Sequence, residues 1–134
     1  MLSVDAQLNL LLVELNRSLL QYLYECSPYV SGDKESKLRE LAEAQQQDVG
    51  VLCDVLTERQ WPIDVGTYPT DYTAIQYNSL SSLADPLKES QSIALSLLDE
   101  VAEACADDAF VFEVLKQLKQ NEETILEQLA ALVA

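Results

Sequence analysis

The chain has 134 residues, 49% of them hydrophobic, which is enough for one domain with a core of its own. Its 23 acidic and 8 basic residues give a net charge of −15, and this field repels phosphate backbones and anionic lipids. The absence of histidine excludes Ser-His and Cys-His nucleophile pairs and imidazole metal ligands. We therefore expect a single domain over residues 1–134 that has neither nucleic acid nor a membrane as its partner.

The first predicted helix runs from about Asp5 to Ser27 and ends before Pro28. Further apolar residues widen its apolar surface, and a helix of this kind is central or lies at a subunit interface. These additional residues are Leu10, Val13, Leu20 and Tyr24. The main apolar stripe consists of Leu8, Leu11, Leu12, Leu15, Leu19, Tyr22, Leu23 and Cys26.

The second predicted helix runs from about Lys34 to Gln60, with Asp33 as its cap. Two polar residues, Gln45 and Asp48, interrupt its apolar stripe. The full stripe is Leu38, Leu41, Gln45, Asp48, Leu52, Val55 and Leu56.

The segment "WPIDVGTYPTDYTAIQYNSLSS" follows, with two prolines and a glycine, and it is too long for a tight helical hairpin. We expect it to cross along the bundle, so that the second and third helices run parallel, and "YTAIQYNSL" to lead into the third helix. Its aromatic residues predict contacts that pin the segment to the helices, and an aromatic ligand pocket is the alternative. These residues are Trp61, Tyr68, Tyr72 and Tyr77.

Two more helices are predicted. The third starts near Ser82 to Pro86 and ends near Ala106, and the fourth runs from about Ala109 to Leu132, with Asp107 or Asp108 as its cap. The stripe of the third helix is Leu83, Leu87, Ser90, Ala94, Leu97, Val101 and Cys105. The stripe of the fourth is Val111, Leu115, Leu118, Glu122, Ile125, Leu129 and Leu132.

The three cysteines, Cys26, Cys53 and Cys105, are far apart and lie near apolar stripes, which is typical of reduced thiols that serve as small core residues. No apolar run reaches the roughly 18 residues that span a bilayer, and "MLSVDAQLN" has no basic segment typical of a secretion signal. We therefore expect a cytoplasmic protein.

The first helix, "LNLLLVELNRSLLQYL", resembles the bacterioferritin pattern through its pairs Leu8-Asn9 and Gln21-Tyr22. "LRELAEAQQQDVGVL" is similar to the second helix of the same family, and the short, long, short order of the connections fits it as well. The resemblance implies an all-α, ferritin-like fold: a four-helix up-down bundle with a long crossover between the second and third helices.

That family usually carries a di-iron or di-manganese site, built from two Glu residues and two Glu-x-x-His pairs. Matched residue by residue, the ligand positions of the second helix fall on Gln45 and Asp48, and that of the first falls on Leu15. In the fourth helix they fall on Asn121 and Thr124 or on Glu122 and Ile125. The resemblance therefore implies the fold without its di-metal site, and we expect no bound cofactor.

Two interpretations of the interior polar residues stay open. Four carboxylates could supply oxygen ligands to Mn²⁺, Mg²⁺ or Ca²⁺, although Glu14 and Glu89 each lie one residue off their stripes. These candidate ligands are Glu14, Asp48, Glu89 and Glu122. The favoured interpretation is a hydrogen-bonded polar layer that fixes the register of the helices, made by Gln45, Asp48, Asn121 and Glu122.

The functional hypothesis that follows is a non-enzymatic bundle that acts through homo-oligomerisation or protein interaction. A homodimer through the apolar surface of the first helix is the simplest form. A metal-dependent oxidase or hydrolase with oxygen ligands, and a bundle that binds a small molecule, are the alternatives.

Overall fold

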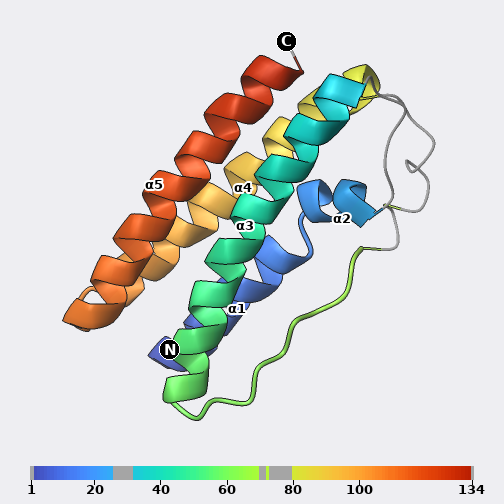
Figure 1. The fold of residues 1–134 in the computed structure, drawn as a ribbon. Coiled ribbons are helices and arrows are strands. Elements are labelled where there is room, and N and C mark those ends of the chain that lie inside the picture. Colours follow the sequence, from blue (N-terminus) through green and yellow to red (C-terminus); the bar gives the residue numbers. More distant parts are fainter. Residues whose placement is uncertain (1, 26–31, 70–71, 73–79, 134) are drawn as a thin grey trace.

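The computed structural model describes residues 2–25, 32–69, 72 and 80–133, and the fold is all-helical (Figure 1). No strand occurs in these ranges. The elements are α1 (Val4–Asn16), α2 (Leu19–Glu25), α3 (Gly32–Glu58), the short 3-10 helix η2 (Ser81–Leu83), α4 (Ala84–Ala104) and α5 (Ala109–Leu132). Within the described ranges, no helix combines the length and apolarity needed to cross a bilayer.

The helices α1, α3, α4 and α5 lie side by side, whereas α2 turns away from the direction of α1 (Figure 1). Both α1 and α5 pack against α3 and α4. The bounds of α5 confirm the prediction for the last helix, and Asp108 is its N-cap because its Oδ1 accepts the Val111 N–H at 3.2 Å. Asp33 is not the cap that was predicted, since α3 already begins at Gly32 and Asp33 lies in its first turn.

The prediction of one continuous first helix is wrong, because α1 ends at Asn16 and α2 begins at Leu19. Ser18 lies at the break and is 4% exposed. Its hydroxyl oxygen accepts the backbone N–H of Gln21 at 3.3 Å and donates to Gln45 Oε1 at 2.7 Å. The first bond serves one of the free N–H groups that begin a helix, and the second fixes the break against α3. The predicted continuation through Cys26 lies outside the described residues.

The buried apolar side chains form two clusters, one at each end of the long helices. The α1 cluster takes its members from α1, the second halves of α3 and α4, and the first half of α5: Leu8, Leu11, Leu12, Leu15, Val49, Leu52, Val55, Leu56, Ala94, Leu98, Val101, Cys105, Val111, Leu115 and Leu118. The α2 cluster takes its members from α2 and the opposite halves: Leu19, Leu20, Tyr22, Leu23, Leu38, Leu41, Ala42, Leu80, Leu83, Leu87, Ile125 and Leu129. Each long helix except α1 therefore contributes to both clusters.

The extended segment 61–69 runs beside α1 (Figure 1) and is tied to it by side-chain amides. Asn9 Nδ2 donates to the carbonyl oxygen of Asp64 and Asn9 Oδ1 accepts the Asp64 N–H, both at 3.0 Å. Asn16 Nδ2 donates to the Val65 carbonyl at 3.1 Å. Gly66 has φ +72°, and a Cβ there would lie 2.6 Å from Val13 Cγ1, so only glycine allows this close approach.

The aromatic residues of this connection contact the helices, as predicted for Trp61, Tyr68 and Tyr72. Trp61 packs against the α1 cluster, and Tyr68 and Tyr72 pack against the α2 cluster. The rings of Tyr68 and Tyr72 lie 5.2 and 5.3 Å from that of Tyr22. Tyr77 and most of the predicted helical lead-in lie outside the described residues.

Candidate functional site

A layer of buried polar side chains lies between the two apolar clusters. Along α3, α4 and α5 its members stand between residues of one cluster and residues of the other. We call this set the interior polar layer: Ser18, Gln21, Gln45, Asp48, Gln91 and Glu122, each at most 4% exposed. Because the α1–α2 break, α3, α4 and α5 all contribute, the layer crosses the whole interior.

Gln45 is the centre of the interior polar layer. Its Oε1 accepts hydrogen bonds from Ser18 Oγ at 2.7 Å and Gln21 Nε2 at 3.0 Å. Its Nε2 donates to Gln91 Oε1 at 3.0 Å and to Glu122 Oε1 at 2.9 Å. All four hydrogen-bonding positions of this amide are thereby used.

Gln91 completes the amide environment of Glu122. Its Nε2 donates to Glu122 Oε1 at 2.9 Å and to the Glu122 carbonyl oxygen at 3.0 Å. One oxygen of the buried carboxyl group thus receives an amide donor from α3 and another from α4. These two donors occupy the lone pairs of Oε1, one of the two carboxyl oxygens of Glu122.

Asp48 and Glu122 form the acidic part of the layer. Asn121 Nδ2 donates to Asp48 Oδ1 at 2.9 Å. The other two oxygens, Asp48 Oδ2 and Glu122 Oε2, are buried without a hydrogen-bond partner among the described residues. Two ionised carboxylates can only accept, so both oxygens would remain unsatisfied at a high cost. One proton held between the two carboxyl groups satisfies both.

The surroundings of Glu122 favour its protonated form. Burial, and after it the hydrogen bond with Asp48, raise its pKa to about 8. The amide donors of Gln45 and Gln91 act in the opposite direction but are outweighed. Glu122 therefore carries a proton at neutral pH and donates it toward Asp48.

The four residues predicted for a polar layer come together, although not all are buried. Gln45, Asp48 and Glu122 lie in the interior, whereas Asn121 lies at the exposed edge of the layer and reaches Asp48 from there. Sequence reasoning missed Ser18, Gln21 and Gln91. In α4 the predicted stripe ran through Ser90 and Leu97, which are half-buried, whereas their neighbours Gln91 and Leu98 are buried.

The four candidate metal ligands do not converge. Asp48 and Glu122 belong to the interior polar layer, whereas Glu14 and Glu89 line a groove between α1 and α4 on the outside of the helices. Within the described part of the chain, no three Asp, Glu or Cys side chains gather in a way that could hold a metal ion. The arrangement thus favours hydrogen bonding over cation binding.

The described cysteines lie in apolar surroundings. Cys105 is buried in the α1 cluster, and Cys53, which is half-buried, packs against it. Burial is the main cause that raises the pKa of both thiols, with Asp54 adding to it at Cys53 and Asp108 at Cys105. Both are therefore protonated, weakly reactive thiols that fill space. Cys26 lies outside the described residues.

Comparison with models of known protein families, with curated proteins and with solved structures finds no match to this chain.

Proposed function

We propose that this chain is a ferritin-like four-helix up-down bundle, with a long crossover between α3 and α4, that lacks a di-iron site and acts through association. In this assignment α2 continues the first helix of the bundle after the break at Ser18. Gln45 and Asp48, at the Glu-x-x-His positions implied by the resemblance, support it because they meet Glu122 between the helices. The two free thiols Cys53 and Cys105 fit a reducing, cytoplasmic location.

One observation carries the proposal: the amide groups of Gln45 and Gln91 bond to other members of the interior polar layer, and two carboxyl oxygens remain without a partner among the described residues. Gln45 and Gln91 present N–H donors to Glu122 where a metal site would present oxygen ligands to a cation. One proton between Asp48 and Glu122 satisfies the two remaining oxygens. In this proposal the interior polar layer stabilises the fold, and the function lies on the surface.

The proposed association is a homodimer. The apolar surface of the first helix, predicted as its interface, is not continuous: Leu20 is 2% exposed and Val13 lies against Gly66, whereas Leu10 and Tyr24 are 48% and 39% exposed but belong to separate helices, α1 and α2. Other exposed apolar side chains remain on the surface, including Val51, Ile93, Phe110 and Phe112. The interface is therefore sought on another face.

Two measurements test the proposal. Protein purified without chelators is expected to contain less than about a tenth of an equivalent of transition metal, and a stoichiometric metal would instead favour the metal-dependent enzyme. Sedimentation velocity is expected to show a dimer at micromolar concentration. A strict monomer at high micromolar concentration would refute homodimer formation.

A second candidate function, the binding of a small molecule, is favoured by a pocket of about 370 Å³ beside the α1–α2 break. Arg17, Gln21 and Gln46 line it together with one carboxylate, Glu25, and Arg17 has no ion pair within the described ranges. An unpaired guanidinium beside amide groups suits a small carboxylate. Thermal stabilisation by small carboxylates that disappears in Arg17→Gln would support this function, and no stabilisation by any of them would refute it.

A further inference from the structure

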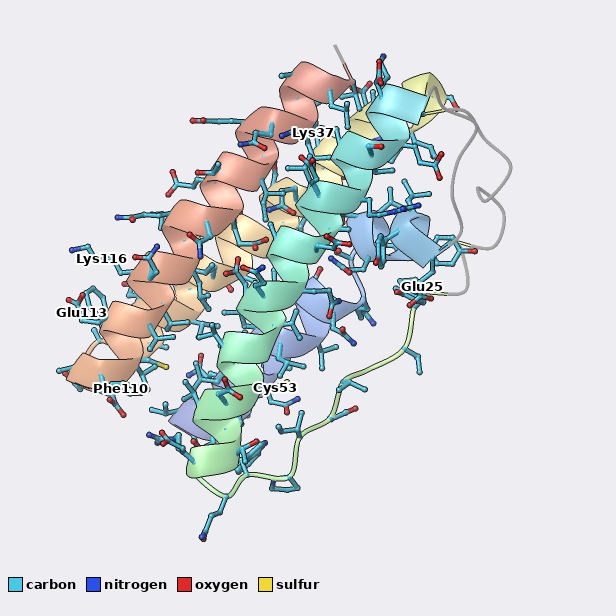
Figure 2. The ribbon with its side chains drawn as sticks, viewed as in Figure 1. Glu25, Lys37, Cys53, Phe110, Glu113 and Lys116 are labelled. Carbon is cyan, nitrogen blue, oxygen red and sulfur yellow. The ribbon has the colours of Figure 1, made fainter. Side chains whose placement is uncertain are left out.

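A groove between α4 and α5 exposes mainly apolar surface. It has a volume of about 550 Å³, with Ala102 of α4 and Ala106, in the turn after α4, on one side and Phe112 of α5 on the other. Phe112 is 39% exposed, and Phe110, at the beginning of α5 (Figure 2), is 61% exposed. Phe112 is the exposed aromatic side chain that lines the groove, and it lies beside two small residues, so this surface offers both a protruding ring and a shallow recess.

The charges around this α4–α5 groove are balanced, unlike those of the whole chain. Two carboxylates, Asp99 and Glu103, and two lysines, Lys116 and Lys119, line it, whereas the chain has 23 acids and 8 bases. Lys119 Nζ pairs with Asp99 Oδ1 at 2.8 Å. Lys116, on the outer side of α5 (Figure 2), has no ion pair in the described ranges. Lys116 and Glu103 therefore remain available for a partner.

The groove between α1 and α4 has the opposite character. Its charged lining residues are Glu14, Glu89 and Glu100, and no lysine or arginine lines it. Two copies joined through that groove would bring these carboxylates together, and this repulsion disfavours self-association. In a chain of net charge −15, the balanced α4–α5 groove therefore costs less electrostatic free energy to bring against its own copy than the α1–α4 groove does.

We propose that a second copy of this chain docks on the α4–α5 groove in a two-fold dimer. Phe112 of each copy lies in the groove of the other, against Ala102 and Ala106, and Lys116 of each copy pairs with Glu103 of the other. A two-fold axis makes every contact occur twice, so one protruding ring, one recess and one pair of opposite charges suffice. This inference rests on the proposed association and specifies its surface.

The first experiment is sedimentation velocity on the full chain and on two matched variants, Phe112→Ser and Ile93→Ser. Both positions are exposed apolar residues, but Ile93, 51% exposed, lies in the α1–α4 groove. Phe112→Ser is expected to weaken the dimer at least about tenfold, whereas Ile93→Ser leaves the dissociation constant unchanged. Circular dichroism melting curves show whether each variant is folded.

A charge exchange tests the pairing itself. Lys116→Glu and Glu103→Lys are each expected to weaken the homodimer, since like charges then face each other twice. A one-to-one mixture of the two variants is expected to form a heterodimer in which both pairs are opposite in sign. Mixing cannot repair a folding defect in either variant, so dimer formation that is restored only in the mixture reports the charge pairing itself.

The possible outcomes distinguish the α4–α5 interface from homodimer formation in general. If Phe112→Ser stays dimeric while Ile93→Ser dissociates, the α4–α5 interface is refuted and homodimer formation stands. If the charge-exchanged mixture forms no heterodimer, the Lys116–Glu103 pairing is refuted. If the unmodified chain is monomeric at high micromolar concentration, both the interface and the homodimer are refuted.

Discussion

Replacing Glu122 by Gln should make the stability of the protein less sensitive to pH. The Gln side chain has the shape of a protonated Glu, so its Oε1 can keep the bonds from Gln45 and Gln91. Its Nε2 can donate permanently to the unpartnered Asp48 Oδ2. The variant therefore reproduces the protonated layer and cannot lose that proton.

The sign of the effect follows from the pKa of Glu122. It is about 8 in the folded chain against 4.5 for the free side chain, so the folded state binds more protons between these values. This contribution to stability is fully present below about pH 4.5 and is lost as pH rises toward 8. At 1.36 kcal/mol per pKa unit, the wild-type chain should lose roughly 3–4 kcal/mol of its free energy of unfolding between pH 5 and pH 8.

Urea unfolding, followed by circular dichroism at several pH values, measures this loss. Glu123→Gln is the matched control, because Glu123 is the exposed neighbour and its replacement makes the same chemical change outside the interior polar layer. Only Glu122→Gln should flatten the pH dependence and exceed the wild type in stability at pH 8, because only Glu122 holds a proton inside the layer. Equal pH dependence of the two variants would refute the shared proton.

Three further predictions use the same urea assay. Asp48→Asn and Glu122→Gln should each be tolerated. The double variant should lose about 1–3 kcal/mol more free energy of unfolding than the two single variants together, because two amide N–H groups would then face each other. If the two effects simply add, the pairing of Asp48 with Glu122 is contradicted. Gly66→Ala should cost about 1–3 kcal/mol through its φ of +72° and the contact with α1, and an unchanged midpoint would show that segment 61–69 is not held there. Ser18→Ala should cost about 0.5–2 kcal/mol for the lost cap of α2, and no loss would mean that the break does not depend on this hydroxyl.

The sequence predicted the long helices well because their apolar periodicity is strong. The bounds of α5 agree with the prediction, and the α3 stripe is buried throughout, Gln45 and Asp48 included. A polar side chain that interrupts an apolar stripe can be recognised from one helix alone. Gln45, Asp48 and Glu122 were recognised in this way.

The remaining members of the layer depend on contacts that no single helix displays. Ser18 lies in an unbroken helical pattern, and the break there rests on its bond to Gln45, 27 residues away. In α4 the pattern permits either Ser90 or Gln91 on the buried face. In the structure Gln91 is on the buried face and bonds to Glu122 of α5. Glu122 is too far along the chain for the pattern of α4 alone to reveal this contact.

The interior polar layer also divides the molecule for local unfolding. If the α2 cluster unfolds locally, the hydrogen bonds of Gln45 and Gln91 must break together before the α1 cluster can open. The two clusters are therefore expected to behave as separate cooperative units in native-state hydrogen exchange, with amides on either side of the layer protected to different extents. The same six side chains that join the helices across the bundle thus set a boundary along it.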